Sequence, residues 1–437
     1  MNTMKTLLRQ GLPIRGKSDI NSNIFQFNLD KAKSNPGLEL LMTENKYFAH
    51  DILDEQEELI ILNSCRNLIN EIKQCHYFSI ICDESTDVSK TEKLSFSVRT
   101  CNETTFEVNE DFIGVFPCDQ GVTSDALKGY IDDILVRCNL PKEKLVGMSF
   151  DGAASMKRLA TLLKQDIGEH MLYVHCFAHC NELVFKDATN SSELLSSAQN
   201  LCEELYALVG VSPKRVLLFE NIQKEMQTIS EDGDTGKIAT LKNLSVTRWT
   251  TRGSAAQVLM SKTNELKEVL TQLSGDVSAS RECRAKSRGL LKKITSQGQL
   301  FHLFSMHELA VILEKNSKHF QSSSITAELA VYCIKSVRIR LEELRSEEEF
   351  QRILKEVNEN EVEETTKRRR INKVMTDFAV HSKVPLHSKE KGYPIEELRR
   401  LYFEAIDLLK LSFDSRFDQP DVRKLQNLIR GSHFGSS

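Results

Sequence analysis

The stretch YFSIICDESTDVS, from Tyr77 to Ser89, joins a short apolar run directly to an acidic, hydroxyl-rich segment. Isoleucine and phenylalanine in so short a run favour a buried strand, which we predict over residues 78–83. A strand that ends in carboxylates places them at the carboxyl edge of an α/β sheet, where such folds usually carry their chemistry. Asp83 is therefore a candidate site residue.

A second stretch, LVGMSF over residues 145–150, repeats this pattern and breaks at Asp151. Helix-forming sequence lies between the two, so we predict parallel strands joined by a right-handed crossover. Asp83 and Asp151 would then meet at neighbouring strand tips, which is the geometry that a two-metal phosphoryl-transfer site requires. The alternative is that both aspartates only cap helices or shape turns.

Composition indicates a soluble globular chain. The 437 residues are 40% hydrophobic and 27% charged, with a net charge of −4. No overall basic field draws the chain to nucleic acid, so any such contact must come from local patches. The eleven cysteines form no C-x-x-C pair, which indicates reduced thiols in the cytosol or nucleus. No apolar run reaches the length of a membrane span, so we expect no membrane contact.

Apolar periodicity predicts an α/β core followed by a helical region. We expect a helix over 51–74, strands over 78–83, 94–100 and 106–116, a helix over 123–138 capped by Thr123 or Ser124, a strand over 145–150, a helix over 155–167, a strand over 171–174 and a helix over 177–188. Further helices are predicted over 194–209, 213–227, 255–273, 285–314, 325–357 and 395–413. The predicted domains are a helical N-terminal segment (1–75), an α/β core with a mixed sheet (76–190) and an all-α domain (191–437).

Four motifs stand in order along the chain: IICDESTDVSKTEKLSFSVR (80–99), MSFDGAASM (148–156), YVHCFAHCNELV (173–184) and TRWTTRGSA (247–255). Together they resemble the transposases of the hAT superfamily and their domesticated relatives, in particular the zinc finger MYM-type 1-like group. The segments 7–28 and 412–417 also look like parts of that group. The resemblance therefore spans nearly the whole chain.

The resemblance implies a ribonuclease H-like core interrupted by a large helical insertion domain. It implies that Asp83 and Asp151 hold Mg²⁺ or Mn²⁺ as two of the three metal-binding carboxylates of the family. Cys176 and His179 match the family's Cys-x-x-His pair. Arg248 and Trp249 match its Arg-Trp signature, which would face DNA bases. Stacking a base on the indole of Trp249 contributes about 1–3 kcal/mol, although Trp249 could equally be a buried packing residue.

Departures from the family pattern concern the third carboxylate. The family carries it after the insertion, at the start of a C-terminal dimerisation region, whereas this chain ends at LIRGSHFGSS. Ser346-Glu347-Glu348 looks similar but falls inside the helix predicted over 325–357. We therefore expect a domesticated or truncated transposase-like protein that lacks the usual dimerisation region and has little or no transposase activity.

Three functions remain open on this reading. The preferred one is nuclear binding of DNA or of nuclear proteins without catalysis. The second is an active cut-and-paste DNA transposase that uses divalent metal, with Glu308 or Glu328 as the first candidates for the missing carboxylate. The third is a protein-interaction scaffold without DNA binding, which would lack the salt-sensitive affinity that phosphate contacts produce.

Two further clusters are weaker signals. His175, Cys176, His179 and Cys180 could hold zinc, but we favour a strand-to-helix junction with buried thiols and do not expect zinc. A basic run could be a nuclear localisation signal or a solvated loop. We favour localisation, which would make the protein nuclear rather than cytoplasmic; the run consists of Lys367, Arg368, Arg369 and Arg370, with Lys373 nearby.

Overall fold

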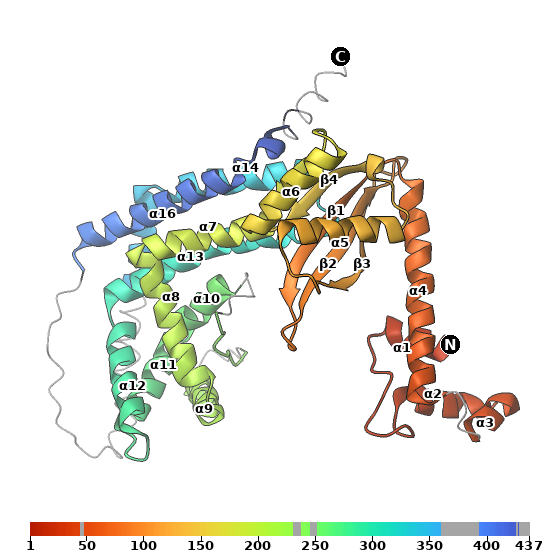
Figure 1. Cartoon of the computed structure of the whole chain (residues 1–437). Helices are drawn as coiled ribbons and strands as arrows, with labels where there is room; N and C mark the ends of the chain where they lie inside the picture. The colour runs from red at the N-terminus through yellow and green to blue at the C-terminus, as the bar shows by residue number, and fades with distance from the viewer. Residues whose placement is uncertain (44–47, 230–236, 245–250, 360–392, 425–426, 428–437) are drawn as a thin grey trace. The chain divides into compact units, whose positions relative to one another are not determined.

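The structure, a computed structural model, describes residues 1–43, 48–229, 237–244, 251–359, 393–424 and 427 (Figure 1). The chain divides into two compact units, one of Met1–Met148 with Arg158–Met171 and one of Ser149–Lys157 with Leu172–Ser437. The domain boundaries predicted at residues 75 and 190 stay predictions. Several predicted functional residues lie outside the described residues: Arg248, Trp249, Lys367, Arg368, Arg369 and Arg370.

The N-terminal segment is helical, as predicted. It contains α1 (Asn2–Arg9), α2 (Asn23–Ala32), α3 (Pro36–Thr43) and α4 (His50–Gln74). The side chain of Ser22 accepts a hydrogen bond from Phe25 N and so caps α2. These helices share a small apolar core of their own, which includes Met4, Leu7, Ile24 and Leu53.

Three antiparallel strands follow: β1 (Phe78–Thr86), β2 (Glu92–Cys101) and β3 (Val108–Pro117). Alternate residues of β1 and β2 are buried, and the register places Ile80 opposite Val98 and Cys82 opposite Phe96. The alternation predicted for the second strand is therefore confirmed. Because side chains alternate across a sheet, this register puts the buried residues of both strands on one face.

The acidic segment after the first apolar run is mostly strand and hairpin turn. β1 continues through Thr86, so the prediction that it ends at Asp83 is wrong by three residues. The turn is built by Asp87, whose carboxylate accepts hydrogen bonds from Ser89 Oγ (2.6 Å) and Thr91 N (2.9 Å) and pairs with Lys93. These partners hold the pKa of Asp87 well below its ordinary value. β1 extends beyond its apolar residues because its pairing with β2 continues up to this turn.

The rest of the core alternates helix and strand as predicted: α5 (Ser124–Arg137), the short 3₁₀ helix Lys142–Lys144, β4 (Leu145–Phe150), α6 (Ala154–Ile167), β5 (Leu172–His175) and α7 (Phe177–Ser191). Thr123 caps α5 by accepting from Ala126 N (3.3 Å). The strand order is β3-β2-β1-β4-β5. The fold is the predicted α/β class, with a ribonuclease H-like mixed sheet and a large helical insertion.

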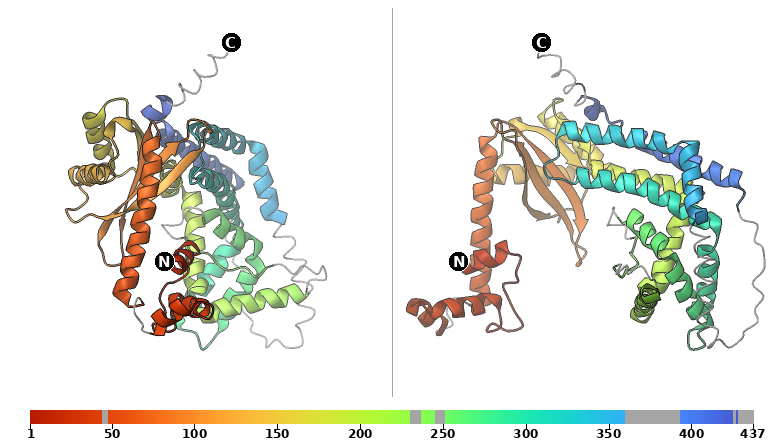
Figure 2. Two further views of the ribbon diagram at one scale, coloured as in Figure 1. Left: turned by 90° about the vertical axis from the view of Figure 1, so that its right-hand side faces the viewer. Right: turned by 180° about the vertical axis from the view of Figure 1, so that it is seen from behind.

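The helical region contains α8 (Glu193–Leu205), a π-helical turn (Tyr206–Gly210), α9 (Pro213–Ile229), α10 (Arg252–Ser261), α11 (Thr263–Gly275), α12 (Arg281–Ile294), α13 (Gln297–Phe320), α14 (Ala327–Leu344), a helix over 347–359, and α16 (Ile395–Phe417). In both figures α13, α14 and α16 run alongside one another (Figures 1 and 2). No helix in the described part of the chain is long and apolar enough to cross a bilayer.

Three helices predicted as continuous are each two helices. They break at Lys262, at Thr295-Ser296 and at Arg345-Ser346. Hydroxyl side chains at the breaks bond to nearby backbone groups, since Thr295 Oγ1 donates to Leu291 O (2.8 Å) and Ser346 Oγ accepts from Glu349 N (3.3 Å). Such local bonds compete with continuation of a helix. Ser346 and Glu347 therefore lie at a helix start, and not inside a helix as predicted.

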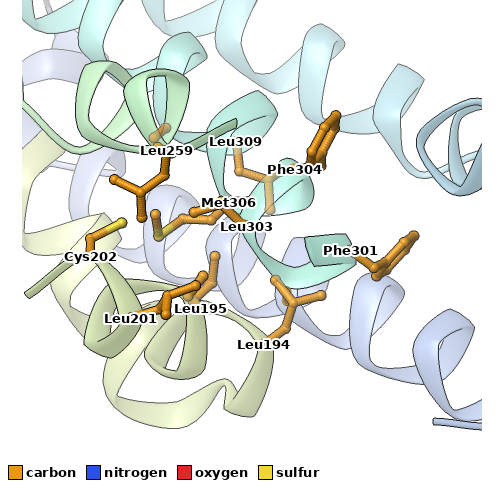
Figure 3. Close-up of a cluster of buried hydrophobic side chains, with 14 of the residues drawn as sticks. Leu194, Leu195, Leu201, Cys202, Leu259, Phe301, Leu303, Phe304, Met306 and Leu309 are labelled. Carbon is orange, nitrogen blue, oxygen red and sulfur yellow. The ribbon is translucent and has the colours of Figure 1, made fainter. Parts of the chain in front are cut away.

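A large apolar core holds the helical region together. Figure 3 shows part of it, where Leu194, Leu195, Leu201 and Cys202 of α8 face side chains of α10 and α13. The residues of α13 that contribute include Phe301, Leu303, Met306 and Leu309. Because α13 is buried around most of its circumference, it acts as the central helix of this core.

One buried polar residue stands out in this core. His302 of α13 is fully buried, and neither ring nitrogen has a hydrogen-bond partner among the described residues. Its ring packs edge-on against Tyr393, with ring centroids 5.3 Å apart. Burial lowers the pKa of His302 to about 4, so the imidazole is neutral when the protein is folded at neutral pH.

His302 should make folding stability sensitive to acid. An unfolded histidine protonates near pH 6.5, whereas folded His302 stays neutral to about pH 4, so stability is fully present above pH 6.5 and falls as the pH drops through this window. Between about pH 7 and about pH 5, the free energy of unfolding of His302→Leu should therefore fall by about 2 kcal/mol less than that of the wild type. Denaturant unfolding at the two pH values measures this difference.

Exposed His319, on the same helix, supplies the control. His319→Gln should leave the wild-type pH dependence unchanged. An equal loss of stability with acid in His302→Leu and the wild type would contradict the prediction.

Candidate functional site

The end of β4 carries the second motif, and its aspartate shapes the turn. Half-buried Asp151 accepts a hydrogen bond from Ala153 N through Oδ1 (3.1 Å), immediately before α6 begins at Ala154. Side chains that bond to their own backbone two residues on form Asx turns. One oxygen of this candidate metal ligand therefore has a structural role, which is the alternative that the sequence left open for Asp151.

The third motif returns to this turn at the end of β5. The backbone N–H of Cys176 donates to Phe150 O (2.8 Å), and the hydroxyl of Tyr173 donates to Asp151 O (3.1 Å). The rings of Phe150 and Tyr173 also pack together, with centroids 6.0 Å apart. Two motifs separated by the sixteen residues 157–172 thus form one bonded junction.

His175 sits at the centre of this junction against the backbone of Gly152. A Cβ atom on Gly152 would lie 2.3 Å from Cε1 and 2.5 Å from Nε2 of the His175 ring. His175 is buried, and its Nε2 has no hydrogen-bond partner among the described residues. Burial, followed by the nearby charges of His179, Lys157 and Arg416, lowers the pKa of His175 to about 4. The imidazole is therefore a neutral packing group seated on a glycine.

The predicted Cys-x-x-His pair lies beside this histidine at the start of α7. The rings of His175 and His179 are 5.6 Å apart between centroids. Cys180 is buried, and burial raises the pKa of its thiol to about 12. In the described part of the chain, no three or more His, Cys, Asp or Glu side chains are grouped so that they could hold a metal ion. The predictions of magnesium or manganese at Asp83 and Asp151, and of no zinc at Cys176 and His179, remain predictions.

Two residues from the far end of the chain complete the junction. Gln419 Oε1 accepts from His175 N (2.8 Å), and Asp421 Oδ2 accepts from Tyr173 N (2.9 Å). Both follow α16, which packs along α7, and Arg416 pairs with Asp187 of α7. Because β5 ends the strand order, these side chains satisfy N–H groups on an edge strand. The sequence contains no local pattern that marks residues 419 and 421 for this role.

The fourth motif is joined to the third by an ion pair. Arg252, at the start of α10, donates two hydrogen bonds to the carboxylate of Glu182 on α7, at 2.7 and 2.5 Å. Its guanidinium also lies 5.0 Å from the centroid of the Phe185 ring. The next residue, Gly253, donates its N–H to Glu314 (2.6 Å). Arg248 and Trp249 of the same motif lie outside the described residues, so their predicted contact with DNA bases stays a prediction.

Asp83 lies within β1, opposite Ser95 of β2, and its side chain is exposed. Ser95 Oγ donates to the Asp83 carbonyl oxygen (3.1 Å). Asp83 belongs to the first unit and Asp151 to the second. β1 and β4 are neighbours in the strand order. The predicted pocket shared by Asp83 and Asp151 stays a prediction.

The glutamates considered for a third metal ligand have other partners or surroundings. Glu308 pairs with Arg352 (3.4 Å), and Glu347 pairs with Arg399 (2.6 Å). Glu328 is exposed in the first turn of α14. Glu308 and Glu347 therefore take part in ion pairs between helices.

Residues 1–160 match the family described as ZMYM1/FAM200, RNase-like domain. The matched segment takes in the N-terminal helices, β1 to β4, and the Asp151-Gly152 turn. The match supports the predicted likeness to the zinc finger MYM-type 1-like group and the ribonuclease-like character of the core.

Gly152→Ala tests the packing of the second motif against the third. The added Cβ must displace the His175 ring, so we expect a loss of about 1–3 kcal/mol of unfolding free energy. In Gly152→Ala/His175→Ala the clash is absent, and the two losses should not add. The matched control is Gly289→Ala, at an exposed position of α12 with open space around the new atom, which should be neutral or stabilising. Additive losses in the double variant would contradict the predicted contact.

Proposed function

We propose that this chain is a hAT-type, transposase-derived protein that binds duplex DNA in the nucleus and does not cleave it. The observation that carries the proposal is the match of residues 1–160 to an RNase-like domain of the ZMYM1/FAM200 type. The complete five-stranded sheet and the helical insertion are consistent with it. In this proposal the ribonuclease H-like core is kept as a folded binding module.

The role of the motif residues supports binding over catalysis. One carboxylate oxygen of Asp151 accepts a hydrogen bond from Ala153 N, and the neutral ring of His175 packs against Gly152. Glu182 and Arg252 bond to each other across two helices. Each of these interactions would be retained in a protein that needs the fold and not the reaction. They account for the motifs without a catalytic role.

The chemistry of strand transfer sets a further requirement. Two metal ions about 3.5–4 Å apart need several carboxylates to hold them. Asp83 and Asp151 supply oxygen ligands of the kind that Mg²⁺ or Mn²⁺ takes, and a bound ion would stabilise charge on a phosphoryl oxygen. Recruiting Glu308 or Glu347 as a third ligand would first break its ion pair with Arg352 or Arg399. Because breaking either ion pair costs free energy, we propose that the chain has no third metal ligand and does not cleave DNA.

A DNA-binding and cleavage assay tests the proposal. Full-length protein is mixed with labelled duplex DNA over a series of salt concentrations, with Mg²⁺, with Mn²⁺ or with EDTA. We expect affinity to fall steeply as salt rises, because phosphate contacts release counterions. Asp83→Asn and Asp151→Asn should bind as the wild type does, and no protein should cleave the DNA. Exposed Asp133, which pairs with Arg137 on α5, provides the control variant Asp133→Asn.

Two outcomes would replace the proposal by its rivals. Metal-dependent cleavage by the wild type that is lost in Asp83→Asn, but kept in Asp133→Asn, would establish an active transposase. Affinity for DNA that is absent at every salt concentration would favour a protein-interaction scaffold.

A further inference from the structure

Helix α12 concentrates positive charge in a chain that is acidic overall. Its fourteen residues carry six lysines and arginines and a single acidic residue, Glu282, whereas the whole chain has a net charge of −4. In Figure 1 the helix lies beside α11 in the helical region, and the two pack against each other. The cations of α12 are therefore a local feature that overall composition conceals.

Four of these cations share one side of the helix. They are separated by three, four and four residues, the spacing that aligns side chains on an α-helix. At 1.5 Å per residue they extend over about 16 Å. The packed side of α12 is formed by Ser287, Leu290 and Ile294. We call the aligned cations the α12 basic face; it consists of Arg281, Arg284, Arg288 and Lys292.

The two flanking lysines of α12 are neutralised, and two arginines of the basic face are not. Lys286 pairs with Glu282 (2.8 Å), and Lys293 pairs with Glu204 (2.7 Å). Within the part of the chain that the structure describes, neither Arg281 nor Arg288 has a carboxylate partner. Both side chains are exposed. Their charges are thus available to an anion from outside the chain.

Backbone contacts fix the middle of the basic face. Arg284 donates to the carbonyl oxygens of Asp276 (3.3 Å), Val277 (3.1 Å) and Ala279 (2.6 Å) in the loop between α11 and α12. Carbonyl partners hold the guanidinium in place without cancelling its charge. A held cation loses less conformational entropy when an anion binds to it.

The start of α9 adds two more cations near the N-terminal end of α12. Arg215 lies with Nη1 4.0 Å from Cys283 Sγ of α12. Hydrogen bonds from Ser278 and, more weakly, the charge of Lys214 hold the pKa of Asp276 below its ordinary value. Lys214 therefore lies near the α11–α12 loop. Two anionic groups of this region, Asp276 and Glu282, each have a partner within the chain.

We propose that the α12 basic face, with Lys214 and Arg215 near its N-terminal end, binds the phosphate backbone of duplex DNA. This inference rests on the proposed function and assigns it a surface in the helical insertion. The planar guanidinium of arginine can donate two parallel N–H bonds to the oxygens of one phosphate. Proteins that hold single strands stack the bases on aromatic side chains, and α12 contains none. A duplex, whose bases are already stacked, is the partner that this face fits.

Paired charge removals on two sides of the same helix test the assignment in the full-length chain. Arg281→Gln/Arg288→Gln removes two cations of the basic face and spares Arg284, which holds the loop. Lys286→Gln/Lys293→Gln removes two cations from the neutralised flank. Fluorescence anisotropy with a labelled mixed-sequence duplex gives the affinity over a range of salt concentrations. Single-stranded RNA of equal length and polyglutamate are the competitor arms.

In Arg281→Gln/Arg288→Gln, loss of two phosphate contacts should make the negative slope of log affinity against log salt shallower by about 2. Binding should weaken about tenfold or more near 0.1 M salt. The flank variant should keep the wild-type slope, and duplex DNA should compete better than the other polyanions. An unchanged slope in Arg281→Gln/Arg288→Gln, an equal loss in the flank variant, or stronger competition by RNA or polyglutamate would overturn the inference. If the wild type binds no DNA, the proposed function itself fails; if it binds and both variants match it, only this surface is wrong.

Discussion

The His175 ring seated on Gly152 is the contact on which the ends of β4 and β5 depend. No side chain can occupy position 152 while the ring stays where it is, since even a Cβ atom would lie 2.3 Å away. The hydrogen bond from Cys176 N to Phe150 O closes the junction on the backbone side. An uncharged imidazole is compatible with this position, because a buried charge without a partner would cost several kcal/mol. Burial keeps it uncharged.

Helix α7 connects this junction to the helical region. It begins two residues after His175, and its polar side chains bond to segments far along the chain. Asn181 donates to Leu313 O and to Ser317 Oγ, each at 2.7 Å, and Glu182 pairs with Arg252. The side chains of that pair are only 11% and 16% exposed. Removal of one partner would leave the other charge poorly solvated, which costs more than the pair itself contributes. Motifs that look like separate functional signatures are thus parts of one packing arrangement.

Charge distribution matters more than total charge in this chain. A net charge of −4 indicates no general attraction to nucleic acid. The same chain nevertheless gathers uncancelled arginines on one side of α12, while the flanking lysines are paired. The net charge governs long-range steering. Binding at a contact depends instead on the charges within a few ångströms of each group, because salt screens exposed charges over about 10 Å.

Local patterns in the sequence determined the order of helices and strands, the alternation in β2, and the Thr123 cap of α5, because each depends on residues within one or two turns. They also singled out Asp83, Asp151 and the strand-to-helix junction at Cys176. Only the tertiary structure decided how long β1 runs, since pairing with β2 carries it past Asp83 to the Asp87 turn. Likewise, the roles of Gln419 and Arg252 depend on partners 244 and 70 residues away. No local periodicity encodes such contacts, because they exist only once the chain has folded and brought distant segments together.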